Sequence, residues 1–183
     1  DGYRYKDGKK FSISIMTTSG NQVREKVQSY IKDNLKTVGI ELTIDNKPAN
    51  VLFDDMIGKR KFPHLAMYAW VMGPNADGES FWTVDGIPTE KNNWMGQNIP
   101  GYRNAEVDAI DKKVPTLLEE SERRKLLLRE QEIWVEDLPS IPLYFRNDVS
   151  LTVTDLENWT LTGTSTPVTW NCPSACLKVV ERR

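Results

Sequence analysis

The sequence contains few of the residues on which most catalytic and metal sites depend. Its 183 residues include two cysteines and a single histidine, His64. A structural zinc site needs about four ligands, and His64 lies far along the chain from Cys172 and Cys176. The C-x3-C spacing of the cysteines leaves two interpretations open, a small disulfide loop in an oxidising compartment or a pair of free thiols. The sequence therefore argues against a metal site.

Long apolar runs and an excess of either charge are also absent. No apolar run approaches the roughly 18 residues of a membrane span. The 24 Lys and Arg against 26 Asp and Glu give a net charge of −2, which argues against nucleic acid as a partner, since that would call for a clustered basic face. Glycine-rich phosphate motifs are missing as well. Because residues 1–4 are charged and turn-like, we expect a mature or excised segment without a signal peptide.

The acidic and hydroxyl residues do not form a recognisable catalytic set. A Ser/His/Asp triad would require His64, which we expect to be a structural residue because it stands alone. Adjacent acids such as Asp54 and Asp55 point apart on a helix, so glycosidase chemistry is not supported. Residues 119–125 carry acids first and bases after, which suits an exposed helix start. The sequence predicts no enzyme and no cofactor.

Hydrophobic periodicity predicts the beginning of the fold. Residues 11–16 and 40–44 alternate apolar and polar side chains, as a strand does. Between them, apolar residues recur every three or four positions from Val23 to Val38, and Gly39 follows where a helix C-cap is expected. Strand, helix and strand make a βαβ unit with two parallel strands. The predicted fold class is α/β.

Similar patterns predict further elements along the chain. A helix is expected from Pro48, and residues 65–71 are apolar throughout, as in a largely buried strand. Two more helices are expected, one capped by Asn104 and one starting near Ser121, which is expected as its N-cap. Two short strands complete the prediction, residues 141–145 and 149–153.

A long loop rich in rings and carboxamides is the most informative feature. Residues 72–103 lack periodicity, and a connection of about 30 residues is longer than ordinary loops. Apolar rings combined with amide groups are the usual lining of a ligand pocket, although any single ring could simply pack the loop against the sheet. The rings are Tyr68, Trp70, Phe81, Trp82, Trp94 and Tyr102, and the amides include Asn75, Asn92, Asn93, Gln97 and Asn98.

Several stretches follow one another in a familiar order. They are residues 7–11 (DGKKF), 36–42 (KTVGIEL), Trp70, 92–94 (NNW), 101–108 (GYRNAEVD) and 136–144 (EDLPSIPLY). This order resembles the C-terminal lobe of family 5 extracytoplasmic solute-binding proteins, the peptide, nickel and oligosaccharide receptors of bacterial ABC importers. The resemblance covers roughly residues 1–172. No single motif is specific, but the ordered set is.

The resemblance implies a fold and a domain organisation. It implies a βαβ-based mixed sheet with flanking helices, one lobe of a two-lobe periplasmic-binding-protein fold of class II. Residues 1–183 would form a single C-terminal lobe, with a core over 1–146 and a tail over 147–183 that returns toward the first lobe. In that tail the apolar residues Trp159, Leu161, Val168 and Trp170 would then lack their natural partner, and self-association of the lobe could cover them.

The resemblance also implies a function. Such receptors are not enzymes: two lobes close around a peptide or similar solute, and a membrane permease accepts the closed form. The location would be periplasmic or extracytoplasmic, with lipid anchoring of the full-length protein as one option. The alternative function is a non-transport sensor or adaptor module of the same fold that binds a protein partner. The residues do not identify the solute.

The candidate ligand contacts come from the ring-rich loop. Peptide-binding members carry an acid a few positions after the tryptophan at the strand end, and it anchors the amino terminus of the peptide. After Trp70 this sequence has no acid before Asp77, which departs from that pattern. Asp108 is expected at a helix start or in packing. The candidate contacts are Trp70, Met72, Asp77, Trp82, Asn93 and Trp94.

Overall fold

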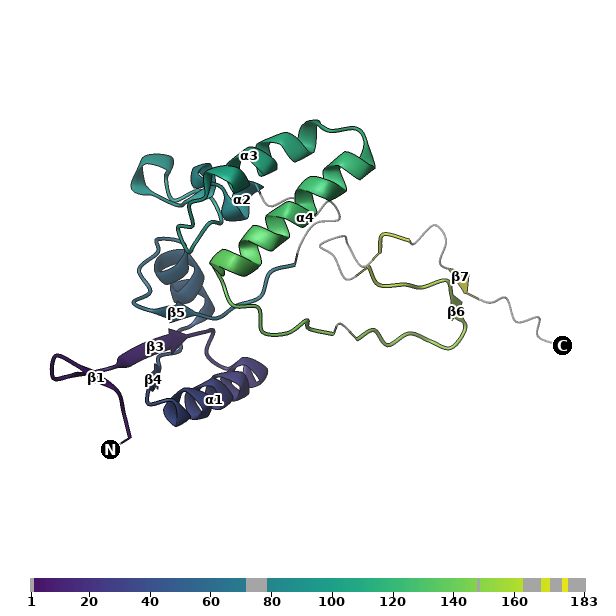
Figure 1. The fold of residues 1–183 in the computed structure, drawn as a ribbon. Helices are drawn as coiled ribbons and strands as arrows, with labels where there is room; N and C mark the ends of the chain where they lie inside the picture. The colour runs from purple at the N-terminus through teal and green to yellow at the C-terminus, as the bar shows by residue number, and fades with distance from the viewer. Residues whose placement is uncertain (1, 72–78, 148, 163–168, 172–175, 178–183) are drawn as a thin grey trace. The chain divides into compact units, whose positions relative to one another are not determined.

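The computed structural model describes residues 2–71, 79–147, 149–162, 169–171 and 176–177 (Figure 1). The chain divides into two compact units. The first unit comprises residues 1–69 and 78–139, and the second comprises residues 70–77 and 140–183. No helix in the part of the chain that the structure describes is both long and apolar enough to cross a membrane.

A three-stranded parallel sheet forms the centre of one half of the first unit. Its strands are β3 (Ser12–Met16), β4 (Glu41–Ile44) and β5 (Leu65–Ala66), in the order β4-β3-β5. Helix α1 (Gln22–Thr37) connects β3 to β4 and packs against β4 (Figure 1). The predicted βαβ unit is therefore confirmed, with its first strand starting one residue later than expected.

Both ends of α1 form where the sequence predicts them. The Asn21 side chain accepts a hydrogen bond from the Arg24 backbone N–H at 3.1 Å and so caps the first turn. At the other end, Gly39 takes a left-handed φ of 78°, and its N–H donates to the Lys36 carbonyl at 3.0 Å. A residue without a side chain is needed at this C-cap, because a Cβ on Gly39 would lie 2.9 Å from the Arg4 side chain.

The buried part of the apolar stripe on α1 is shorter than the periodicity of the sequence suggests. Val23 and Val38, at the two ends of the predicted stripe, remain 61% and 46% exposed. The middle of the stripe covers the sheet, where buried Ile15, Leu42 and Met67 form a core cluster. The α1 residues packed on that cluster are Val27, Ile31 and Leu35.

The segment after β4 begins as predicted, but the third strand is much shorter than predicted. The Leu52 N–H donates to the Pro48 carbonyl at 2.9 Å, and the π-helical turn η1 (Val51–Ile57) buries Leu52 and Ile57. Strand β5 covers only Leu65–Ala66, whereas a buried strand was expected over residues 65–71. Trp70 and Val71 are about half exposed. The prediction fails because β3, the only strand that pairs with β5 among the described residues, ends at Met16, and apolar composition alone cannot distinguish a strand from an irregular segment.

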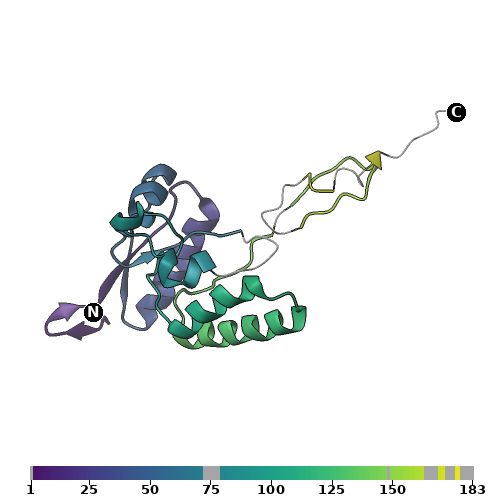
Figure 2. The ribbon, with the colours of Figure 1, turned by 90° about the horizontal axis from the view of Figure 1, so that it is seen from above.

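Two antiparallel helices form the other half of the first unit. Helix α3 (Ala105–Lys113) and helix α4 (Glu120–Asp137) lie side by side, joined through the short turn η4 (Val114–Thr116) (Figure 2). Asn104 caps α3 as predicted, since its side chain accepts from the Glu106 N–H at 2.9 Å. The expected cap of α4 at Ser121 is wrong. The N-cap is Glu119, without a side-chain hydrogen bond, and acids in the first turn complement the helix dipole instead.

The second unit contains a small antiparallel pair. Strand β6 (Leu156–Glu157) pairs with β7 (Cys176–Leu177). The strands predicted over residues 141–145 and 149–153 do not form, and Phe145 and Leu151 are 100% and 95% exposed. A strand needs a neighbouring edge for its backbone hydrogen bonds, and no such edge pairs with these segments among the described residues. The disulfide question lies outside the described residues, because Cys172 and the side chain of Cys176 are not described.

The apolar tail residues are described only in part. Trp170 is 49% exposed and Leu161 is 37% exposed, while Trp159 is partly buried. Val168 lies outside the described residues. The described part of the tail therefore does carry exposed apolar groups.

Candidate functional site

The predicted contact residues fall into both units. Asn93 and Trp94 are neighbours on a loop of the first unit, and Trp82 lies at the end of the short helix α2 (Glu79–Trp82) of the same unit. Trp70 belongs to the second unit, where its side chain is 51% exposed. Met72 and Asp77 lie outside the described residues.

A completely buried carboxamide closes the loop that carries Asn93 and Trp94. Asn98 has no exposed surface, and its Nδ2 donates to the Thr83 carbonyl at 2.8 Å and to the Tyr102 carbonyl at 3.0 Å. Its Oδ1 accepts from the Tyr102 N–H at 2.9 Å. One side chain thus ties the two ends of the loop, residues 83–102, together. Sequence reasoning grouped Asn98 with the amides of a ligand wall, and it has a structural role instead.

A second carboxamide shapes the turn just before the exposed tryptophan. The Asn92 Oδ1 accepts from the Thr89 N–H at 2.8 Å, and its Nδ2 donates to the Ile87 carbonyl at 2.9 Å. The bond to Thr89 is one half of a capping box around the short turn η3 (Glu90–Asn92), whose other half is the Thr89 side chain accepting from the Asn92 N–H. Asn92 therefore also positions the backbone rather than facing outward.

One glycine, Gly96, allows the loop to cross over itself. A Cβ on Gly96 would lie 2.1 Å from the carbonyl oxygen of Gly86, and Gly96 has a left-handed φ of 116°. The Asn98 N–H donates to the same Gly86 oxygen at 2.9 Å. Only glycine fits at position 96, because backbone atoms, unlike a flexible side chain, cannot move aside cheaply.

The backbone at the tip of the loop is strained and displays a tryptophan. Asn93 and Trp94 have consecutive left-handed φ values of 54° and 61°, a conformation that costs roughly 1–2 kcal/mol per non-glycine residue. The Trp94 N–H donates to the Thr89 carbonyl at 2.8 Å, and its side chain is 37% exposed beside Met95 at 70%. Strained residues that surrounding contacts hold in place tend to occur at ligand sites. The loop therefore presents a ring and an amide on a fixed backbone.

Trp82 occupies a different environment. Its ring packs edge to face on Trp134 at 5.8 Å between centroids and contacts the buried cluster between α3 and α4. That cluster consists of Val107, Ile110, Val114 and Ile133. The structure does not group Trp82 with the exposed pair Asn93 and Trp94.

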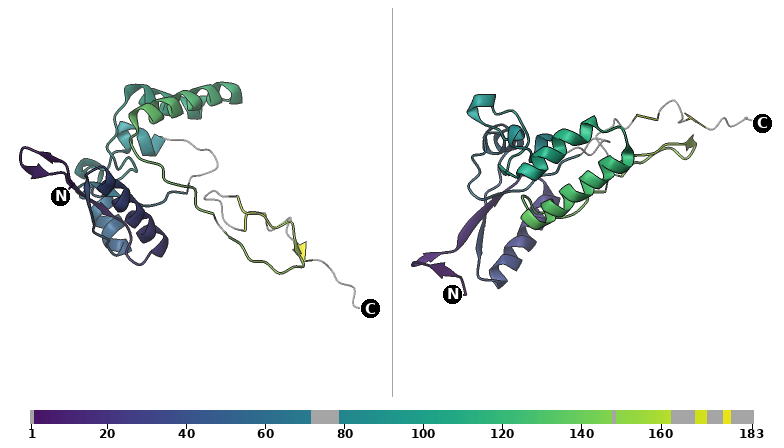
Figure 3. Two further views of the ribbon diagram at one scale, coloured as in Figure 1. Left: turned by 60° about the horizontal axis from the view of Figure 1, so that its bottom comes forward. Right: turned by 45° about the horizontal axis from the view of Figure 1, so that its top comes forward.

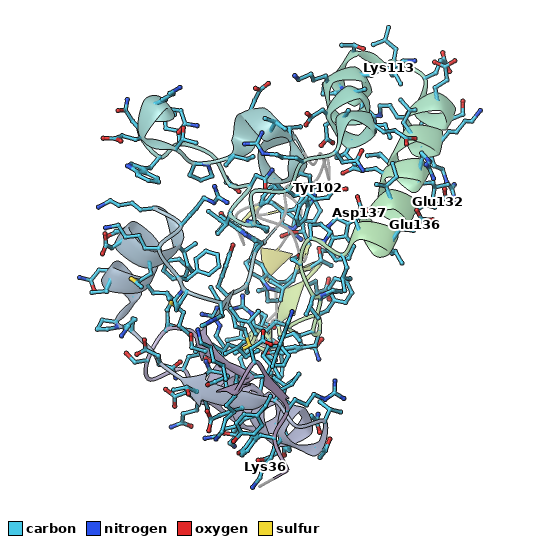
Figure 4. The ribbon with its side chains drawn as sticks, turned by 60° about the vertical axis from the view of Figure 1, so that its left-hand side comes forward. Lys36, Tyr102, Lys113, Glu132, Glu136 and Asp137 are labelled. Atoms are coloured by element: carbon cyan, nitrogen blue, oxygen red, sulfur yellow. The ribbon has the colours of Figure 1, made fainter. Side chains whose placement is uncertain are left out.

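The loop ends against the last turn of α4. The Tyr102 hydroxyl donates to Asp137 Oδ2 at 2.5 Å, and Asn104 Nδ2 donates to the same oxygen at 2.9 Å (Figure 4). Both hydrogen bonds hold the pKa of the Asp137 carboxyl below its usual value. Burial, followed by the neighbouring carboxylate, raises the pKa of Tyr102 to about 12, so the hydroxyl remains a donor at neutral pH.

A buried pair of acids between the two helices was missed by the sequence reasoning. Asp111 on α3 is 2% exposed, Glu130 on α4 is 8% exposed, and their side chains share a hydrogen bond. Burial, and then the charge of Asp111, raise the pKa of Glu130 to about 7. A signal was present, because Glu130 interrupts the apolar stripe that runs from Leu126 to Ile133 at helical spacing.

Two residues considered at the sequence level have structural contacts. His64 Nδ1 lies 3.1 Å from the Ser14 backbone nitrogen and accepts its N–H, as expected for a structural histidine. Asp108 Oδ1 accepts from the Val84 N–H at 2.9 Å, which matches the predicted packing role. Within the described ranges, no three His, Cys, Asp or Glu side chains gather as a metal site would require.

The sequence of this chain is similar to those of known binding proteins. No family model matches the chain. The oligopeptide-binding protein AppA of Bacillus subtilis is 29% identical over 168 residues, which cover 87% of this chain and 28% of AppA. The dipeptide-binding protein DppE of the same organism is 24% identical over 152 residues, which are 82% of this chain and 26% of DppE. This chain thus spans a little over a quarter of the length of these relatives.

Solved structures agree with the sequence relatives. The oligopeptide-binding protein of Thermus thermophilus, solved with a pentapeptide, is 37% identical with a TM-score of 0.71 over 79% of this chain and 26% of its own. Bacillus subtilis AppA with a nonapeptide has a TM-score of 0.69 over 98% of this chain and 34% of its own; at 22% identity it supports the fold alone. The relatives are named as binding proteins, not enzymes. The chain is similar in sequence and in its α/β fold to part of these oligopeptide- and dipeptide-binding proteins, which confirms the resemblance seen in its sequence.

Proposed function

We propose that this chain is the substrate-binding lobe of an ABC-importer receptor that captures peptides. The observation that carries the proposal is the 37% identity and TM-score of 0.71 to a protein solved with a pentapeptide. The relatives are named as oligopeptide- and dipeptide-binding proteins, which favours a peptide receptor over the sensor or adaptor alternative. The partners would be a peptide and a membrane permease, and the location extracytoplasmic, with lipid anchoring as part of the proposal.

The physical basis of capture is closure of two lobes around the ligand. A ligand shifts the equilibrium between an open and a closed state only by the difference in its affinity for the two states. It must therefore contact both lobes in the closed state. This chain spans 26% of the length of the peptide-bound structure, and the second wall would come from the rest of such a protein. The 183-residue chain alone is therefore expected to bind peptides weakly or not detectably.

The proposed contacts are those expected from the sequence, weighted by their surroundings. Trp94 and Asn93 offer an exposed ring and an amide on a strained, well-supported loop. Trp70 offers a second exposed ring. Trp82 would act mainly as support, because it packs on Trp134. Met72 and Asp77 complete the proposed set, with Asp77 as the acid that would meet a peptide amino terminus.

The proposed domain organisation assigns separate roles to the core and the tail. Residues 1–146 would form the lobe core, and residues 147–183 would return toward the other lobe. Exposed apolar residues such as Trp170 and Leu161 support this part of the proposal, since a partner surface would cover them. Without that surface, self-association of the 183-residue chain is expected.

Calorimetry with a protein that contains both lobes tests the proposed function. Binding of short peptides is expected, and Trp94→Ala should weaken it roughly ten-fold or more if the ring is an anchor. Tyr30→Ala, which removes a 71% exposed ring from α1, is the matched control and should leave affinity unchanged. Absence of any peptide binding would overturn the function, whereas unchanged affinity in Trp94→Ala would remove only this contact.

A further inference from the structure

The first strands of the chain form a hairpin in which cations are concentrated. Strand β1 (Tyr5–Lys6) pairs antiparallel with β2 (Lys9–Lys10), and the hairpin projects away from the parallel sheet of the first unit (Figure 3). Residues 3–10 hold four cations and one acid, although the whole chain carries a net charge of −2. The whole-chain balance therefore conceals a local basic surface.

The hairpin is held firmly at its base. The Phe11 N–H donates to the Arg4 carbonyl at 2.8 Å, and the Arg4 N–H donates to the Gly39 carbonyl at 2.7 Å, beyond the last turn of α1. That last turn carries Lys36, which is labelled at the bottom of Figure 4. Lys10 forms an ion pair with Glu41 at 2.9 Å and anchors the hairpin to β4. The charges are thus displayed on ordered backbone rather than on a loose end.

Three of the four cations form no ion pair with an acid among the described residues. Lys10 is paired with Glu41 and lies 4.1 Å from the centre of the Tyr3 ring. Arg4, Lys6 and Lys9 are exposed, and no ion pair joins them to an acid within the part of the chain that the structure describes. Residues 4–7 and 9–11 line an open hollow that contains the acid Asp7 as well as the cations.

Exposed rings accompany the cations. Phe11 is 47% exposed and, by the register that pairs Lys6 with Lys9, lies on the same hairpin face as these cations, so this face offers both positive charge and aromatic area. Tyr5, 53% exposed, pairs with Lys10 on the opposite face. Basic side chains gain free energy at anionic lipid headgroups, and aromatic rings gain it at the boundary between headgroups and acyl chains. An acidic polypeptide in water would satisfy the cations but not the rings.

We propose that the β1–β2 hairpin is a docking surface for an anionic phospholipid membrane. Arg4, Lys6 and Lys9 contact lipid phosphates, and Phe11, on the same face, enters the headgroup layer. This surface is separate from the proposed peptide site and goes beyond it. It holds the protein near the bilayer in which a permease would lie.

Vesicle co-sedimentation of the complete 183-residue chain tests the proposal. The chain is expected to bind vesicles that contain phosphatidylglycerol and not vesicles of phosphatidylcholine alone. Each cation near an anionic surface contributes roughly five-fold in affinity, so the triple variant R4Q/K6Q/K9Q should bind roughly 100-fold more weakly. The matched control R123Q/R124Q/K125Q removes three exposed cations from α4 and should bind as the unchanged chain does. Equal loss in both triple variants, or no binding to anionic vesicles, would overturn the proposal.

Two further measurements separate a lipid partner from a soluble one. Phe11→Ser should weaken vesicle binding but leave binding to soluble poly-L-glutamate unchanged, because only the membrane accepts the ring. If poly-L-glutamate binds the chain as tightly as anionic vesicles do, the partner is an acidic polypeptide and the proposal is wrong. A salt titration of the unchanged chain covers the case in which the triple variant does not fold. Binding must fall steeply with added salt, and salt-independent binding contradicts the proposal.

Discussion

The βαβ segment and the loop over residues 83–102 are stabilised in different ways. In the βαβ segment, apolar side chains at regular spacing pack a helix on parallel strands, Asn21 caps the helix, and one buried amide of α1, Gln28, bonds the side chain of Asn46. In the loop, a buried amide, Asn98, replaces regular structure by bonding three backbone groups. A periodic apolar pattern can therefore be replaced by a few polar groups, but each of them then becomes much harder to substitute.

Glycine substitutions in the two regions should differ most in their effect on the free energy of unfolding. Gly96→Ala places a Cβ 2.1 Å from the Gly86 oxygen at a φ of 116° and should destabilise the protein by about 4 kcal/mol, beyond the common range for point mutants. Gly20→Ala, in the turn before α1, has a φ of 81° but nothing within 4 Å of its Cβ. It should cost only about 1 kcal/mol. Urea unfolding measures both values, and similar losses would contradict the described loop crossing.

The two carboxamides provide the next contrast. Asn98→Ala removes a side chain with no exposed surface and leaves the Thr83 and Tyr102 backbone groups without its bonds. Because each buried group left unsatisfied costs about 1–3 kcal/mol, a loss of about 3 kcal/mol is expected. Asn21→Ala removes a helix cap on the surface and should cost about 1 kcal/mol. The difference between the two free energies of unfolding is the measured quantity, and an Asn21→Ala loss as large as that of Asn98→Ala would contradict the comparison.

The buried acid pair sharpens the comparison through pH. Glu130 keeps its proton in the folded state up to a pKa of about 7, against an ordinary value of 4.5. Between these values the folded state binds more protons than the unfolded state. The free energy of unfolding therefore falls as pH rises from about 4.5 to about 7 and changes little above that. We expect a loss on the order of 2 kcal/mol between pH 5 and pH 8, and its absence in Glu130→Gln.

Hydrogen exchange should locate this effect in one half of the first unit. The ends of the loop are tied to the two helices through the Val84 to Asp108 and Tyr102 to Asp137 hydrogen bonds. Amides of the loop, α3 and α4 should therefore lose protection at high pH, while those of the βαβ segment should change less. The control adds Gln131→Glu to the Glu130→Gln variant. This change places an acid at the next, exposed position of α4, and it should not restore the pH dependence of stability. Uniform loss across both halves would contradict independent stabilisation.

Much of the first half of the fold could be predicted from the sequence because its signals are local. The Asn21 cap, the Gly39 C-cap and the Asn104 cap depend on residues within one turn of the helix they bound. Strand β5 could not be bounded in this way, because its length depends on where β3 ends, about 50 positions earlier. Residues 141–145 failed for the same reason, since strand propensity does not supply a neighbouring edge.

The candidate site was predictable as a region but not as a geometry. Periodicity predicted an α/β fold, composition indicated a ring-rich loop within it, and the order of motifs gave the resemblance to one lobe of a solute-binding family. Only the tertiary structure separated Trp94, exposed on a strained backbone, from Trp82, packed on Trp134, and turned Asn92 and Asn98 from candidate ligand groups into supports. The physical reason is that periodicity and capping are short-range properties of the chain. The exposure of a ring and the partners of a buried amide depend on which distant segments meet, and those contacts form only in the folded protein.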